Sequence, residues 1–221
     1  MLQPLAEDDF TALIAGGKLL EKDGRGPKVY MTADGRIVKL FRVKRRISSN
    51  LLQAYARRFA ANAAALKHAG IVAPTVEFFG KVPHISRQIV IYPMMPGVSL
   101  REALQRADYA EAEGLMRRFG KFLAELHGNG VLFRSVHFGN VIVDGDGMSL
   151  IDILDLKVFR KPVPEGKRTK NIRFLVKYPE DRAMVRNHLA ALRGGYASAF
   201  PGHPQVFAEL EQFANASGGD C

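Results

Sequence analysis

The chain has 221 residues, of which 47% are hydrophobic and 24% charged, with a single cysteine at its last position. This composition excludes a disordered, collagen-like or disulfide-stapled protein and fits one domain or two packed lobes. Cys221 supports neither a thiol-based nor a zinc-based function. Lys and Arg number 32 against 22 Asp and Glu, a formal charge of +10, so an anionic partner is expected: nucleic acid, acidic lipid or phosphorylated sugar.

Targeting signals and basic clusters add little to this picture. No apolar run approaches the roughly 20 residues of a membrane span, and residues 1–9 are acidic where a signal peptide would be basic. The chain is therefore expected to stay in the cytoplasm. Runs of basic residues are as typical of a solvated face as of a binding surface. They fall at Arg42, Lys44, Arg45 and Arg46; Arg57 and Arg58; Arg117 and Arg118; and Arg160, Lys161, Lys167, Arg168, Lys170 and Arg173.

The first part of the chain, residues 1–95, predicts a five-stranded antiparallel sheet with one long helix. Ser48 or Ser49 can cap that helix, which carries apolar residues at helical spacing and ends at Gly70. Alternating apolar segments separated by glycine turns predict the strands. A short helix is expected over 10–15 and strands over 18–21, 28–31, 36–41, 74–79 and 88–92.

The second part, residues 96–221, is expected to be mainly helical with one hairpin. After a break at Pro93–Gly97, Ser99 caps a short helix that runs to about Arg106. A second helix is expected over 110–129, because its apolar residues share one face. The segments 140–143 and 148–151 flank a turn of Asp and Gly and predict a hairpin. The sequence thus predicts the α+β class.

Two features of the first part fit phosphoryl transfer. Gly24 and Gly26 lie in a loop between two strands, where missing side chains let backbone N–H groups approach a phosphate. Lys39 lies in an apolar strand and is placed to pair with phosphates. Each also has a plain structural explanation, as hairpin glycines and as a lysine that points to water.

The segment 126–143, followed by 150–152, resembles the catalytic loop of kinases. In that loop a helix ends in Leu-His-x-x-Gly-Val, a His-Arg-Asp triplet precedes an asparagine, and a hairpin leads to an Asp-Phe-Gly motif. Arg134 matches the arginine, Asn140 the asparagine and Asp152 the last aspartate. With its short length, the hinge at 92–100 and the basic segment 168–175, the chain is most similar to the small bacterial kinases that phosphorylate Kdo or heptose in the lipopolysaccharide core, over about residues 18–182.

The resemblance implies a two-lobed, protein-kinase-like fold with ATP and Mg²⁺ as cofactors. Asn140 and Asp152 would hold the metal and contact the nucleotide. The acceptor would be an anionic sugar or glycolipid, and the protein would be cytoplasmic, with or without peripheral contact with the inner membrane leaflet. The remaining nucleotide contacts that the resemblance implies are Gly24, Gly26, Lys39, Tyr92 and Met94.

Two parts of an active kinase are missing from the sequence. Ser135 stands in place of the aspartate that receives the substrate proton, and Phe133 replaces the histidine before the arginine. No acidic residue lies between Asp34 and Glu77, so the long helix offers Lys39 at most the amide of Asn62. General acid–base help is worth about 10²–10⁴-fold, so a slower reaction can survive.

The candidate catalytic residues are Arg134, Ser135, His137 and Asp155. His137 could replace the missing base or simply order the loop. Asp155 could do so or pair with Lys157 or Arg160. Asp152 could bind metal or form a buried pair with Arg134 or Lys39.

Three functions remain open at this point. An ATP-dependent kinase would require that Lys39, Asn140 and Asp152 converge on one cleft between the lobes. A pseudokinase, a nucleotide-binding or regulatory scaffold, would fit Ser135 and the missing helix glutamate. A nucleic-acid-binding module is disfavoured, because only the net charge supports it and no recognition motif is present. No feature of the sequence indicates an oligomeric state.

Overall fold

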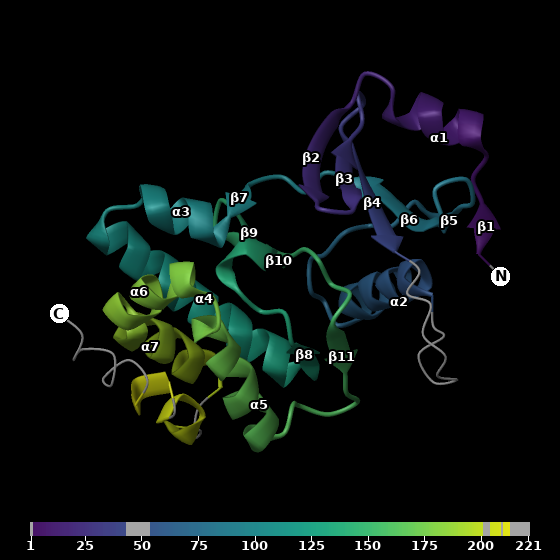
Figure 1. Ribbon diagram of the computed structural model, residues 1–221. Coiled ribbons are helices and arrows are strands. Elements are labelled where there is room, and N and C mark those ends of the chain that lie inside the picture. The colour runs from purple at the N-terminus through teal and green to yellow at the C-terminus, as the bar shows by residue number, and fades with distance from the viewer. Residues whose placement is uncertain (1, 43–53, 201–203, 209, 213–221) are drawn as a thin grey trace. The chain divides into compact units, whose positions relative to one another are not determined.

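The computed structural model describes residues 2–42, 54–200, 204–208 and 210–212 (Figure 1). The chain divides into two compact units, the first formed by Met1–Lys67 and Ala73–Met95 and the second by His68–Val72 and Pro96–Cys221. The short segment His68–Val72, expected in the first lobe, thus belongs to the second unit. There the Val72 carbonyl accepts a hydrogen bond from the Leu150 N–H at 3.0 Å.

The sheet of the first unit has six strands in the order β1-β5-β6-β4-β3-β2. All neighbours are antiparallel except β1 and β5, which are parallel. The prediction of five antiparallel strands was therefore wrong at this edge, because β1 is only two residues long and shows no alternation. The strands are β1 (Gln3–Pro4), β2 (Lys18–Asp23), β3 (Gly26–Met31), β4 (Arg36–Arg42), β5 (Phe78–Val82) and β6 (Arg87–Pro93).

The fourth strand in the chain, β4, shows how the two faces of this sheet are covered. Val38 and Leu40 are buried in one core with Phe10 of α1 (Glu7–Ile14). Phe41 points to the other face, where its ring centroid lies 6.0 Å from that of Phe59 in α2 (Tyr55–His68). Lys39 shares the face of Phe41, because side chains alternate along a strand.

Two expected boundaries in the first unit differ from the structure or fall outside it. The strand expected over 74–79 begins only at Phe78, since Pro74 has no N–H and an apolar pattern alone does not locate a strand start. The caps proposed for the long helix, Ser48 and Ser49, lie outside the described residues.

The second unit is organised around α4 (Tyr109–Gly128), which follows α3 (Leu100–Arg106). The start of α4 is fixed by a capping box, in which Asp108 Oδ1 accepts from the Glu111 N–H at 2.9 Å and Glu111 Oε2 accepts from the Asp108 N–H at 3.1 Å. The remaining helices are α5 (Glu165–Ile172), α6 (Pro179–Asn187), α7 (Leu189–Ala199) and the short helices η1 (Phe138–Asn140), η2 (Arg173–Val176) and η3 (Pro204–Phe207).

Two small sheets complete this unit. The expected hairpin is β9 (Val141–Asp144) and β10 (Gly147–Leu150), to which β7 (Val98–Ser99) adds a third strand. A separate pair, β8 (Val131–Phe133) and β11 (Leu156–Val158), was not foreseen, because three-residue strands carry no period. Within the described residues, no helix combines the length and apolarity needed to cross a bilayer.

Helix α7 packs closely along α4 (Figure 1), and glycines make this approach possible. A Cβ atom placed on Gly120 would lie 2.0 Å from the Leu192 carbonyl oxygen, and one on Gly195 would lie 1.9 Å from the Arg117 carbonyl oxygen. Both neighbours are backbone atoms, so a side chain at either position would force the helices apart.

We therefore expect Gly120→Ala to lower the free energy of unfolding by about 2 kcal/mol, as other overpacked interiors do. Gly114→Ala in the same helix is the matched control, because a Cβ there meets nothing within 4 Å. That variant should be neutral or gain up to about 1 kcal/mol from helix propensity. Urea denaturation of both variants tests the prediction, and equal stability of the two would contradict it.

Candidate functional site

The segment that resembles a kinase catalytic loop runs from the end of α4 to β11, within the second unit. Its ends are held together by the β8–β11 pair, in which Phe133 is the register partner of Leu156. The residues that follow β8 and precede β11 are joined as well, because the Arg134 N–H donates to the Asp155 carbonyl at 3.0 Å. The intervening residues form η1 and the β9–β10 hairpin.

The two expected metal ligands, Asn140 and Asp152, flank the open end of that hairpin. The Asn140 carbonyl accepts from the Ile151 N–H at 3.0 Å, so Asp152 is one residue beyond a residue bonded to Asn140. Asn140 is only 8% exposed, and its Nδ2 donates to the Ser135 carbonyl at 2.9 Å. The structure thus brings Asn140, Asp152 and Ser135 into one small region of the second unit.

Asp152 has an unusual backbone conformation. Its φ is +51°, and among the described residues other than glycine only Ser86 also has a positive φ. This conformation is sterically unfavourable for residues with a side chain, and such strain is concentrated at functional sites. The left-handed turn redirects the chain directly after the hairpin, before the buried Ile153.

Arg134 and Asp155 form an ion pair with each other. Arg134 Nε donates to Asp155 Oδ1 at 3.0 Å, and its Nη2 contacts the same oxygen. Of the two alternatives open for Asp155, general base or ion pair, the structure shows an ion pair, although with Arg134 and not with Lys157 or Arg160. Oδ1 of Asp155 is therefore engaged by Arg134.

His137 is held by its own loop. Its Nδ1 accepts from the Gly139 N–H at 3.1 Å, and its ring centroid lies 4.3 Å from that of Tyr178. Partial burial lowers the pKa of His137, and the nearby Arg101 lowers it further. In the neutral ring the proton therefore sits on Nε2, since Nδ1 is the acceptor. In this tautomer Nε2 of His137 is a hydrogen-bond donor.

The loop rests on Asp181, a residue that the sequence did not single out. Asp181 is 0% exposed and accepts from Arg101 Nε at 2.7 Å and Arg101 Nη2 at 3.0 Å. Its Oδ2 also accepts from the Phe138 N–H at 3.1 Å, one residue after His137. No sequence signal marks this contact, because Asp181 lies in the first turn of α6, where acidic residues are common in any helix.

A second buried network of hydrogen bonds, separate from the one around Asp181, contacts the last residue of β8. His127, fully buried at the end of α4, has Nδ1 2.9 Å from the Tyr196 hydroxyl and Nε2 3.0 Å from Asn171 Oδ1. Asn171 Nδ2 in turn donates to the Phe133 carbonyl at 2.8 Å, directly before Arg134. Burial lowers the pKa of His127 to about 4. His127 is the histidine of the Leu-His-x-x-Gly-Val motif, and the structure gives it this internal role.

The glycine loop of the first unit is a tight turn between β2 and β3. Asp23 and Gly26 are register partners, so only Gly24 and Arg25 form the turn. Gly26 has a φ of +110°, which favours glycine at this position. The Arg25 N–H donates to Asp23 Oδ1 at 2.9 Å. A phosphate could accept from this N–H only after displacing the Asp23 carboxylate.

The other expected nucleotide contacts of the first unit are Lys39, Tyr92 and Met94. Lys39 is half-buried in β4, between Val29 of β3 and Val90 of β6. Tyr92 is buried and stacks on Phe59 at 5.6 Å, whereas Met94 is 53% exposed and its N–H donates to the Gly35 carbonyl at 3.1 Å. Lys39 belongs to the first unit, so its convergence with Asn140 and Asp152 remains a prediction.

The chain has an α+β fold: a unit built on a mostly antiparallel sheet is followed by a mainly helical unit that carries the hairpin. A similar solved structure is "WaaP in complex with acyl carrier protein", with a TM-score of 0.52 and 17% identity over 96% of this chain and 98% of that chain. At this identity the likeness shows the fold alone. No protein-family model and no curated protein match the sequence.

Proposed function

We propose that the protein is an ATP-dependent phosphotransferase that phosphorylates a sugar hydroxyl of the lipopolysaccharide core or a similar small anionic acceptor. The observation that carries this proposal is the adjacency of Asn140 and Asp152 at the end of the β9–β10 hairpin, in a fold like that of WaaP. The positive φ of Asp152 supports the proposal. A residue with a side chain adopts this conformation at a cost in free energy, and such strained residues are concentrated at functional sites.

Asn140 and Asp152 fit a magnesium ion that is shared with phosphate. The Asn140 Nδ2 is bound to the Ser135 carbonyl, which leaves its Oδ1 as the atom that faces a ligand. Mg²⁺ typically takes one or two protein oxygens and completes its shell with phosphate oxygens and water. In the described part of the chain no group of three or more His, Cys, Asp or Glu could hold a metal, so the metal should bind together with the nucleotide.

The other residues have supporting roles in this proposal. Lys39, with the turn at Gly24 and Gly26, would contact the nucleotide phosphates, and Tyr92 and Met94 would border the base. Arg134 and Asp155 hold the loop shape through their ion pair. His137 would use Nε2 as a hydrogen-bond donor to a sugar oxygen. Ser135 is left as the nearest hydroxyl to an acceptor bound beside Asn140.

The acceptor is proposed from charge. A formal charge of +10 favours a substrate that already carries phosphate or carboxylate groups, as a membrane-anchored core glycolipid does. Phosphoryl transfer depends mostly on positioning and on neutralisation of charge, so the reaction tolerates a weak base.

A specific observation also favours the alternative, a pseudokinase that binds nucleotide or regulates a partner. All three candidate bases are compromised: Ser135 is a serine, His137 presents a donor, and Asp155 is paired with Arg134. If none of them accepts the acceptor's proton, the site would bind ATP without efficient transfer.

The first test is thermal melting of the full chain with ATP, with and without Mg²⁺. A ligand at 100 times its dissociation constant adds about 2.7 kcal/mol of stability, which raises the melting midpoint. Asp152→Asn should remove the shift caused by ATP with Mg²⁺. The control is Asp146→Asn, since Asp146 lies on the turn of the same hairpin and pairs with Arg118. If the wild type shows no shift with ATP and Mg²⁺, the kinase and the nucleotide-binding form of the pseudokinase both fail.

The second test separates kinase from pseudokinase. Radiolabelled phosphate is followed from ATP to purified core glycolipid with wild type, Ser135→Ala and His137→Gln. Transfer by the wild type that is lost in Asp152→Asn supports the kinase. Binding of ATP without any transfer supports the pseudokinase.

A further inference from the structure

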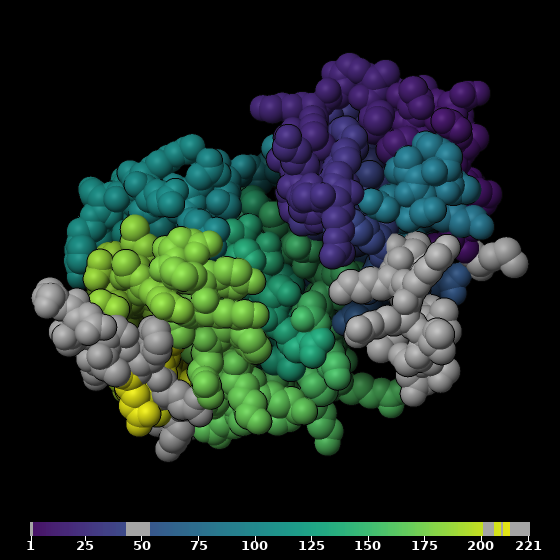
Figure 2. Space-filling view, viewed as in Figure 1, coloured from purple at the N-terminus to yellow at the C-terminus, as the bar shows by residue number. Residues whose placement is uncertain are grey.

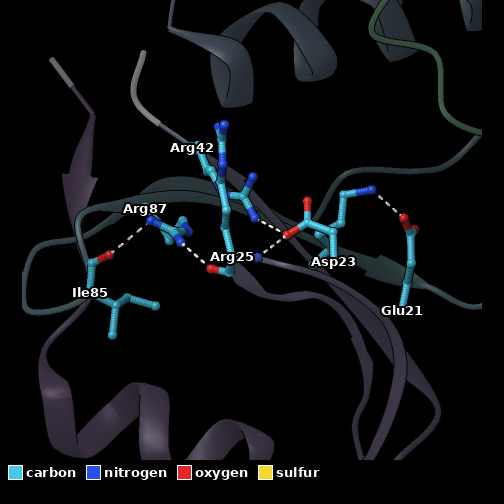
Figure 3. Close-up of polar contacts among 7 residues, drawn as sticks. Glu21, Asp23, Arg25, Arg42, Ile85 and Arg87 are labelled. Atoms are coloured by element: carbon cyan, nitrogen blue, oxygen red, sulfur yellow. Dashed lines mark hydrogen bonds and ion pairs between the residues drawn. The ribbon is translucent and has the colours of Figure 1, made fainter. Parts of the chain in front are cut away.

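Three arginines gather at one end of the sheet in the first unit, around the β2–β3 turn. Arg42 at the end of β4 forms an ion pair with Asp23, directly before the turn. Arg87 at the start of β6 donates from Nη2 to the carbonyl of Arg25, in the turn itself, at 3.3 Å. Figure 3 shows the side chains of Arg25, Arg42 and Arg87 around this turn. We call these three residues the arginine cluster.

The placement of Arg42 and Arg87 is unfavourable by itself. They are register partners, directly opposite each other on the antiparallel strands β4 and β6. Like charges in this relation destabilise a sheet. The side chains of both remain partly exposed.

The charges of the cluster are only partly balanced. Among the residues that the structure describes, Asp23 is the carboxylate in contact with the cluster, and the hydrogen bond from Arg42 is the main reason why the pKa of Asp23 is lowered. Arg87 donates to two backbone carbonyls, of Ile85 and Arg25, each at 3.3 Å. The neighbouring pair Lys28–Glu21 is neutral as a whole. Three guanidinium groups against one carboxylate leave an excess of two positive charges.

We propose that the arginine cluster is a binding site for a phosphate monoester. Its excess of two positive charges matches a phosphate dianion, and guanidinium groups bind phosphate oxygens through paired, charge-assisted hydrogen bonds. Arg25 is exposed, and the β2–β3 hairpin lies on the surface of the first unit (Figure 2).

This site differs from the glycine-loop contacts in the proposed function. It uses side chains of β4, β6 and the turn, whereas the Arg25 N–H is already bound to Asp23. It also does not depend on phosphate transfer, so it can exist in a kinase or in a pseudokinase. The phosphate could belong to a nucleotide or to a phosphorylated sugar, which share this chemistry.

The closing experiment measures binding of glucose 6-phosphate and, separately, of AMP without metal to the full chain by calorimetry at low salt. Arg87→Gln should weaken binding about tenfold, the effect of one charge-assisted hydrogen bond. Asp23→Asn should tighten it about fivefold, because the competing carboxylate loses its charge. Arg36→Gln is the control, since Arg36 lies at the other end of β4 and pairs with Asp34.

The two ligands distinguish the sources of the phosphate. Changes for both ligands identify a general phosphate site, and changes for one ligand identify the sugar phosphate or the nucleotide as its source. The tightening in Asp23→Asn is decisive, because a purely structural Asp23–Arg42 pair would give no gain. Unchanged affinities of both ligands in Arg87→Gln and Asp23→Asn would overturn the proposal. Binding of glucose 6-phosphate needs neither ATP nor Mg²⁺, so this result is independent of whether the proposed kinase function holds.

Discussion

Replacing Asp181 by alanine is expected to lower the free energy of unfolding by about 3–5 kcal/mol, the usual cost of breaking a buried ion pair. Asp181 is completely buried, and three hydrogen bonds converge on it, two from Arg101 and one from the Phe138 N–H. Without the carboxylate, the Arg101 guanidinium and this N–H lose their acceptor. The loop from Ser135 to Asn140 would lose its main support at the same time.

Urea denaturation of the full chain measures this effect, and Glu180→Ala is the matched control. Glu180 is the neighbour of Asp181 and also contacts Arg101, at 3.3 Å, but its side chain is 47% exposed. Exposed ion pairs contribute about 0–1 kcal/mol, so this variant should stay close to the wild type. A loss in Asp181→Ala no greater than that in Glu180→Ala would show that burial of the pair contributes nothing.

A second substitution, Asp181→Asn, tests whether Asp181 also affects function. Asp181 acts on Asn140 only through the loop backbone, so it is a positioning residue for the candidate metal site. Asp181→Asn keeps an oxygen acceptor for the Phe138 N–H and is expected to fold better than the alanine variant. If it folds but needs more Mg²⁺ for the ATP-induced melting shift than the wild type, the loop geometry and not only the stability has changed.

Helices and strands could be predicted from the sequence where neighbouring residues alone form a clear pattern. Helix α4 has both a capping box at Asp108 and an apolar face of several turns, and the β9–β10 hairpin has a turn of Asp and Gly between alternating strands. Strand β1 and the β8–β11 pair have two or three residues each. Segments this short form through tertiary contacts, which no local pattern contains.

In the candidate site, too, contacts between residues far apart in the sequence could not be predicted. Asn140 and Asp152 were expected from the resemblance of segment 126–152 to a kinase catalytic loop, and the structure brings them together within the second unit. The pair of Arg101 and Asp181 joins residues 80 positions apart in the sequence, so only the fold reveals it. The contact that holds His137, the hydrogen bond from the Gly139 N–H to its Nδ1, likewise depends on the local loop geometry, and its role as a base remains a prediction.

The buried His127 should make the protein acid-sensitive. Its pKa is lowered from 6.5 to about 4, mainly by burial, and the positive charge of Arg168 acts in the same direction. Because the folded pKa lies below the unfolded one, the folded state favours the neutral ring. The resulting stability is fully present above pH of about 6.5 and is lost as the pH falls towards 4. The full difference corresponds to about 3 kcal/mol.

The hydrogen bonds give the structural reason. Asn171 Nδ2 donates to the Phe133 carbonyl, so its Oδ1 must accept from His127 Nε2, and His127 Nδ1 must accept from the Tyr196 hydroxyl. Protonation of Nδ1 removes that acceptor and places a second positive charge near Arg168, whose Nη1 lies 3.4 Å from the same hydroxyl. The hydrogen-bond network that includes the Phe133 carbonyl therefore favours a neutral His127.

The measurement is the free energy of unfolding in urea from pH 7.5 to pH 4.5. His127→Gln should be less stable than the wild type at pH 7.5, because glutamine cannot make both bonds, but its stability should fall less steeply with acid. Some slope should remain in this variant, since burial also lowers the pKa of His137. His68→Gln, at the exposed end of α2, is the control and should follow the wild-type profile. A His127→Gln profile parallel to that of the wild type would mean that His127 is not the group whose protonation destabilises the fold.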